Sequence, residues 1–114
     1  MSYGTTPISD EYMQEMLRES KGYCLVLLRT GPNYNEDARP TIIEHGRRNM
    51  ALREEDLLSI VCRVADDSHW AGIGIFDAPV DEVTRIMNED PAVQAGIFIY
   101  EIHPVLSFPG DALP

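Results

Sequence analysis

The sequence has few basic residues. Its 114 residues include nine Lys and Arg against 19 Asp and Glu, for a formal net charge of −10, and Lys21 is the single lysine. Nucleic acids and anionic membranes are bound by clustered basic side chains, so we expect neither of them as a partner. The excess of acidic residues is more simply explained by its effect on solubility.

Long apolar segments and cysteine motifs are also missing. No apolar run approaches the roughly 18 residues of a membrane helix, and the N-terminal sequence MSYGTTPISDEY lacks the basic start and apolar centre of a signal peptide. We therefore expect a soluble, cytoplasmic protein. Cys24 and Cys62 have neither CxxC nor metal-ligand spacing, and both lie in apolar, strand-like segments, which predicts buried free thiols.

Motifs for common cofactors and nucleophiles are absent from the sequence. It contains no dinucleotide fingerprint, phosphate loop or nucleophilic serine motif. His69 stands beside Asp66 and Asp67, but polar residues gathered in one short segment are typical of a turn rather than a metal site. His103 falls at a predicted strand end, where a structural role is expected. We therefore expect neither a cofactor nor a metal ion.

The apolar pattern predicts a core domain between two flanking segments. Strands are expected at residues 23–29, 57–64, 70–76 and 96–103, and core helices at residues 41–55 and 79–89. Pro104 is expected to end the last strand. Residues 1–21 are predicted to be an extension with a short helix capped by Ser9, residues 22–104 the domain, and residues 105–114 a tail.

The predicted order β-α-β-β-α-β indicates an α+β, ferredoxin-like fold. Its four antiparallel strands lie in the order 4-1-3-2, and both helices cover one face. The strands are apolar on both sides, so the uncovered face would expose a large apolar patch of the kind that marks an interface. Face-to-face packing of two such sheets predicts a homodimer, a dimeric α/β barrel.

This topology brings together two polar residues that are distant in the sequence. His45 lies near the start of the first core helix and Asp90 just past the end of the second, and both points fall at the same end of the sheet. A carboxylate can fix the tautomer of an imidazole and stabilise its charged form, which makes a proton-transfer pair. From the residues alone, the simpler interpretation is that His45 is a helix-flank histidine and Asp90 a helix stop before Pro91.

Three stretches form a recognisable pattern over roughly residues 22–104. They are residues 23–29 followed by Gly31-Pro32, then His45 followed by Leu57-Leu58, and lastly DPAVQAG at residues 90–96. This pattern resembles the YCII-related family of the dimeric α/β-barrel group. The resemblance implies that His45 and Asp90 form an active-site pair. It also implies a fold like that of muconolactone isomerase, in a group to which elimination or isomerisation of hydroxylated ring compounds is assigned.

The chain differs from short members of that family in three places. It has an N-terminal extension and a tail that contains FPGDALP, and it has Cys62-Arg63 where many relatives carry Gly-Pro. Arg29, Asn49 and Trp70 are further candidates for contacts to a substrate. A solvated strand-end arginine and a core or dimer aromatic are the alternative interpretations of Arg29 and Trp70.

Three functions fit these predictions. The first is a small cofactor-independent lyase or isomerase that acts on a small cyclic or hydroxylated organic substrate, with His45 as acid and base and Asp90 as its orienting partner. The second is a non-catalytic dimeric module that binds a small molecule in the cleft expected beside the pair, between the two core helices and near Arg29 and Thr30. The third is a monooxygenase-like member of the barrel group. A His–Asp contact that lines a pocket would favour the first function. A pair whose surroundings are filled by other side chains, or one open to solvent, would favour the second. A reaction that requires oxygen would favour the third.

Overall fold

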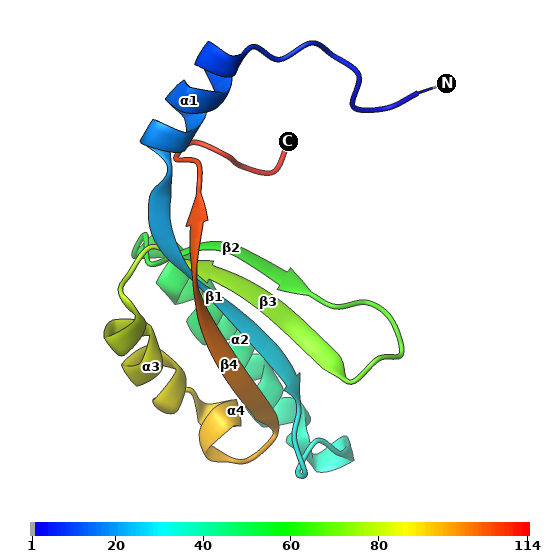
Figure 1. Cartoon of the computed structure of the whole chain (residues 1–114). Helices are drawn as coiled ribbons and strands as arrows, with labels where there is room; N and C mark the ends of the chain where they lie inside the picture. The colour runs from blue at the N-terminus through cyan, green and yellow to red at the C-terminus, as the bar shows by residue number, and fades with distance from the viewer. Residues whose placement is uncertain (1) are drawn as a thin grey trace.

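The protein forms a four-stranded antiparallel sheet with its two longer core helices on one face (Figure 1). The structure, a computed structural model, describes residues 2–114. The elements are α1 (Asp10–Glu19), β1 (Lys21–Thr30), the 3₁₀ turn η1 (Glu36–Ala38), α2 (Arg39–Glu54), β2 (Leu58–Arg63), β3 (Trp70–Phe76), α3 (Val80–Asn88), α4 (Pro91–Gln94) and β4 (Phe98–Ser107). The strand order β2-β3-β1-β4 confirms the predicted ferredoxin-like fold.

The core lies between the sheet and the helices α2 and α3. Alternate side chains of β1, namely Cys24, Val26 and Leu28, are buried on the helix side. They belong to one apolar cluster with Val83 and Met87 of α3. The opposite face of the sheet has no helix over it in the described chain (Figure 1), and its apolar side chains include Leu25, Leu27, Ile73, Ile75 and Ile99.

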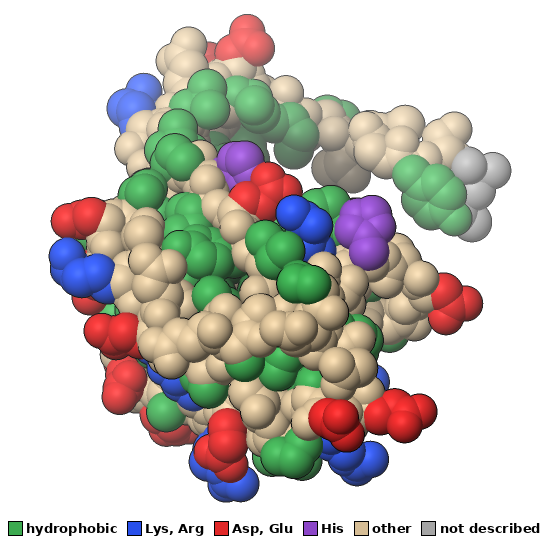
Figure 2. All heavy atoms as spheres, turned by 90° about the horizontal axis from the view of Figure 1, so that it is seen from below, with side chains coloured by type: hydrophobic (Ala, Val, Ile, Leu, Met, Phe, Trp, Pro, Cys, Tyr) green, Lys and Arg blue, Asp and Glu red, His purple; other side chains and the backbone are tan. Residues whose placement is uncertain are grey.

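One end of the sheet extends into a two-stranded ribbon that carries α1. β1 pairs with β4 from Lys21 to Thr30, whereas it pairs with β3 only from Cys24 to Arg29. None of residues 10–19 is buried, and Figure 2 shows hydrophobic side chains on this projecting N-terminal segment. The radius of gyration is 16.9 Å, against about 13 Å for a compact chain of this length. The predicted Ser9 cap is confirmed, because Ser9 Oγ accepts a hydrogen bond from the Tyr12 N–H at 3.1 Å.

Two sequence-based expectations are wrong. Pro104 does not end β4, which continues to Ser107. β4 is an edge strand, and proline is tolerated at an edge because its missing N–H need not face a neighbouring strand. Cys62 is a free thiol but is exposed rather than buried, because it lies near the end of β2, at the other edge. Cys24 is free and buried as expected.

A close contact between two glycines joins the loop after β1 to the loop before β4. The Gly31 N–H donates to the Ile97 carbonyl at 2.7 Å, and the Asn33 N–H donates to the Gly96 carbonyl at 3.0 Å. A Cβ atom on Gly31 would lie 2.5 Å from the Gly96 oxygen, and Gly96 has a φ of +71°. Only glycine fits this approach without strain. The contact fixes the loop that enters α2 against the loop that leaves α4.

We expect Gly31→Ala to lower the free energy of unfolding by about 1–3 kcal/mol, because the new methyl group forces backbone atoms apart. The melting temperature should fall by about 4 °C or more, as measured by thermal denaturation. Gly22→Ala is the control, since a Cβ there meets no atom within 4 Å. Equal melting temperatures for the two variants would contradict a structural role for the glycine contact.

Candidate active site

His45 and Asp90 form a buried hydrogen-bonded pair. His45 Nδ1 lies 2.7 Å from Asp90 Oδ2, and the two side chains are 12% and 1% exposed. This distance confirms the contact predicted from the topology. The Phe98 ring lies beside the imidazole, with 5.1 Å between the ring centroids, and limits its movement. His45 is therefore held in place from two sides.

The two oxygens of Asp90 have different partners. Oδ1 accepts hydrogen bonds from the Ala92 and Val93 N–H groups at 2.9 and 3.3 Å, which makes Asp90 the N-cap of α4, while Oδ2 faces His45. Burial alone raises the pKa of Asp90. The hydrogen bond and charge of His45 and the two backbone donors outweigh that effect and hold the pKa below its ordinary value. Asp90 is thus ionised at neutral pH.

An ionised Asp90 determines the tautomer of His45. The carboxylate can only accept, so Nδ1 of the neutral imidazole carries the proton and Nε2 keeps a free lone pair. Asn49, one helical turn further on, places its Nδ2 atom 3.3 Å from Nε2, as expected for a weak donor to that lone pair. Arg48 donates to the Ile86 carbonyl at 2.7 Å and also forms an ion pair with Asp90, with its Nη1 atom 3.6 Å from Oδ2. The pair is arranged for Nε2 to take a proton.

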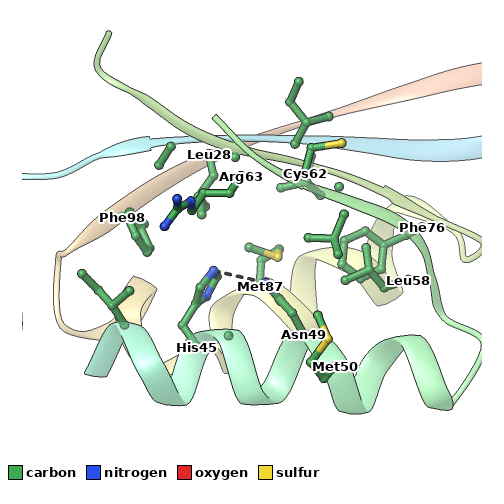
Figure 3. Close-up of a pocket in the computed structure, with 18 residues that line it drawn as sticks. Leu28, His45, Asn49, Met50, Leu58, Cys62, Arg63, Phe76, Met87 and Phe98 are labelled. Atoms are coloured by element: carbon green, nitrogen blue, oxygen red, sulfur yellow. Dashed lines mark hydrogen bonds between the residues drawn. The ribbon is translucent and has the colours of Figure 1, made fainter. Parts of the chain in front are cut away.

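A cavity of about 390 Å³ lies between α2 and the β2–β3 half of the sheet, and His45 lines it (Figure 3). Its walls are largely apolar and include Val26, Leu28, Ile42, Val61, Phe76 and Phe98. The sequence suggested a cleft between the two core helices near Arg29 and Thr30, and this location is wrong. Gly46 of α2 and Gly72 and Gly74 of β3 line the cavity and bring no side chain into it. The free volume therefore lies on the helix side of the sheet, between the sheet and α2.

The other predicted contact residues are divided between two places. Asn49 lines the cavity beside His45. Arg29 and Trp70 are paired across β1 and β3, both are exposed, and neither is among the cavity-lining residues. Trp70 instead lies against His69, with 5.1 Å between the ring centroids. The structure places Asn49 beside the His45–Asp90 pair, here called the dyad, but leaves Arg29 and Trp70 outside this cavity.

Arg63 lines the cavity and was missed by the sequence analysis. The β2–β3 register contains a bulge between Leu58 and Ile60, after which Val61 pairs with Gly74 and Arg63 with Gly72. Strict alternation from Leu58 would place Ile60 and Cys62 toward the helices. The extra residue reverses the faces, so that Val61 and Arg63 face inward while Cys62 faces outward. No sequence signal marks the bulge.

Neither a metal cluster nor a membrane helix is found within residues 2–114. No group of three or more His, Cys, Asp or Glu side chains there is placed to hold an ion. His103, whose Nε2 lies 3.3 Å from Glu101 Oε2, is exposed at the sheet edge. No helix of this part of the chain is both long and apolar enough to span a bilayer.

Comparison with known proteins identifies the fold but not a family. No protein-family model matches the chain, and no curated protein matches it. A solved structure of 5-chloro-2-hydroxyhydroquinone dehydrochlorinase from Burkholderia phenoliruptrix, in complex with 2,5-dihydroxybenzoquinone, matches with a TM-score of 0.58 and 18% identity, covering 71% of this chain and 90% of that one. The chain therefore shares its ferredoxin-like α+β fold with that protein. At this identity the likeness concerns the fold alone.

Proposed function

We propose that the protein is a small cofactor-independent enzyme of the lyase or isomerase type, and that His45 is its general acid and base. The observation that carries the proposal is the 2.7 Å contact between His45 and the buried Asp90 at the wall of a cavity of about 390 Å³. That volume falls in the range of small-molecule sites and suits a single-ring compound. The substrate we propose is therefore a small organic molecule, cyclic or hydroxylated.

The reaction follows from the tautomer of His45. Nε2 removes a proton from a hydroxyl or C–H group of the substrate, and the electron pair that remains forms a new π bond. In an elimination, a leaving anion departs from the neighbouring carbon; in an isomerisation, the imidazolium returns the proton at another carbon. Asp90 stabilises the imidazolium while it exists, because the ionised Oδ2 accepts its Nδ1–H.

Two similarities support this chemistry. The chain shares its fold with a dehydrochlorinase whose solved structure holds a dihydroxybenzoquinone. His45 and the DPAVQAG stretch resemble the active-site pattern of the YCII-related family, to which we assign the protein as part of this proposal. A non-catalytic binding module would use the same cavity, so turnover is the decisive observation.

The test is a thermal-shift screen followed by an assay of turnover. Hydroxylated quinones and chlorinated hydroxyhydroquinones, with 2,5-dihydroxybenzoquinone as the first probe, should raise the melting temperature, because a ligand at 100 times its Kd stabilises the folded state by about 2.7 kcal/mol. Compounds that bind are then followed by absorbance with and without oxygen. Oxygen-independent turnover supports the proposal. Binding without turnover would favour the binding module, and turnover that requires oxygen would favour a monooxygenase.

We also propose that the protein is a homodimer that packs through the open sheet face. Ile73 and Ile99 are 38% and 37% exposed on that face, and the projecting α1 exposes Tyr12, Met13 and Leu17. These side chains form apolar surface that a second copy can cover. In this proposal the ribbon and α1, which project from the body of the chain, contact the partner.

Light scattering at micromolar concentration should therefore give twice the mass of one chain. Ile73→Glu should shift the protein toward the monomer, because the new charge would be buried at the interface. Ile43→Glu is the matched control: Ile43 is 50% exposed on α2, on the helix side of the sheet, and its replacement should leave the dimer intact. A monomeric wild-type protein would refute the proposed assembly.

A further inference from the structure

The cavity contains a positive charge that the dyad does not use. Arg63 extends from β2 into the space that holds the His45 ring (Figure 3). Across the described chain, residues 2–114, its guanidinium forms no ion pair and no hydrogen bond with another residue, although the protein carries 19 carboxylates. Arg63 is thus available to a ligand.

The surroundings of Arg63 favour a negatively charged ligand. Of the described residues that line the cavity, none is Asp or Glu, and the walls are largely apolar. Arg63 as a whole residue is exposed to solvent. An anion held between its guanidinium and the apolar walls would nevertheless lose part of its surrounding water, which strengthens the attraction between the two charges. Its planar fork of N–H donors matches two oxygens of a carboxylate or of adjacent ring oxygens.

The fold directs this side chain inward. The bulge in β2 turns Arg63 to the helix side of the sheet, and its partner across the ladder is Gly72. Glycine has no side chain on that face, so nothing at this position stands between the arginine and the cavity. Arg63 and His45 therefore reach the same space from opposite walls, one from the sheet and one from α2.

We propose that Arg63 is the substrate-binding residue that selects an organic oxyanion, a ring compound whose carboxylate or ionised hydroxyl pairs with the guanidinium while His45 faces a neighbouring proton. This names the substrate class of the site proposed above and rests on that function. The positive charge of Arg63 also stabilises the further negative charge that develops on the bound ring while the proton is removed. The residue thus contributes to binding and to the stability of the reacting state.

Matched pairs of charged and neutral probes test the proposal by calorimetric titration. One pair is 2,5-dihydroxybenzoquinone, a vinylogous acid that is already an anion at neutral pH, and 2,5-dimethoxybenzoquinone, which stays neutral. The other pair is 3-hydroxybenzoate and 3-hydroxybenzamide, and comparing the two pairs distinguishes a ring oxyanion from a carboxylate. The wild-type protein should bind the charged member of at least one pair more tightly. Arg63→Gln should lose about 10-fold or more in affinity for that anion and keep its affinity for the neutral probe.

Arg85→Gln is the control, because it makes the same change in net charge at an exposed position on α3 that does not line the cavity. Its affinity should equal that of the wild-type protein. Equal binding of both members of each pair, no binding of either anion, or unchanged anion affinity in Arg63→Gln would each overturn the proposal. Anion binding that depends on Arg63 without any turnover would instead remove the proposed reaction and leave this site standing.

Discussion

Replacing His45 with glutamine is expected to lower turnover of the substrate by about 10²–10⁴-fold, the usual contribution of a general acid or base. The Nε2 lone pair is the group placed to take a proton, and an amide cannot replace it. Glutamine keeps an N–H donor that can reach Asp90, so the buried carboxylate need not lose its partner. The loss should therefore appear in kcat rather than in the melting temperature.

The measurement is steady-state kinetics combined with thermal denaturation and light scattering. His69→Gln is the matched control, since His69 is exposed against Trp70 and does not line the cavity. It should retain wild-type turnover. Full activity in His45→Gln would eliminate acid–base catalysis by this histidine. A lower melting temperature with unaltered ligand binding and turnover would instead assign the pair a structural role.

Asp90→Asn is expected to reduce turnover by a factor on the order of 10²–10⁴ while preserving the fold. The amide oxygen can still accept the N–H groups of Ala92 and Val93, because asparagine caps helices as well as aspartate does. The amide nitrogen that replaces Oδ2 cannot accept the His45 Nδ1–H or balance an imidazolium. The substitution therefore separates the two functions of this side chain.

The same variant should change the pH dependence of stability. The pKa of Asp90 is lowered in the folded state, so its ionised form adds stability above the unfolded pKa of about 3.9, and that stability is lost as the pH falls through the folded value. The loss of unfolding free energy caused by Asp90→Asn should thus be largest above about pH 4 and should become smaller in more acidic solution. Urea denaturation across this range measures it, with Glu89→Gln as control, since the Glu89 side chain is 74% exposed. A deficit that is independent of pH would contradict the role of the charge.

The sheet order and the dyad could be predicted because both depend on long-range rules of topology. Once the elements read β-α-β-β-α-β, the handedness of the connections leaves few arrangements, and these bring His45 and Asp90 to one end of the sheet. The helix stop at Asp90-Pro91 was correctly recognised. The short helix α4 that follows was not, although aspartate before proline is also a common way to begin a helix.

The cavity and Arg63 could not be predicted, because they depend on local geometry. A single bulge between Leu58 and Ile60 reverses the faces of β2, and alternation in the sequence gives no sign of it. A glycine on the inner side of a helix, such as Gly46 of α2, can let a neighbouring backbone come close. A Cβ there would meet nothing within 4 Å, so this glycine instead leaves part of the cavity empty. A glycine can be filled over by a neighbouring backbone or can leave an unfilled volume. Which of the two occurs depends on the packing of distant segments, and the residues around the glycine do not reveal it.

The ribbon at the far end of β1 and β4 has a consequence for amide exchange. There Lys21 to Tyr23 pair with Val105 to Ser107 and do not pair with β3, although Lys21 Nζ lies 2.9 Å from Asp77 Oδ1, just past the end of β3. A two-stranded ribbon is marginally stable in water, so in a single chain it opens locally at a small fraction of the global unfolding free energy. Its amide protons should exchange quickly while those of Cys24 to Leu28 stay protected. A partner that covers the ribbon would slow the exchange of these amide protons and leave the exchange of the core amides unchanged. The ribbon amides therefore report on assembly residue by residue.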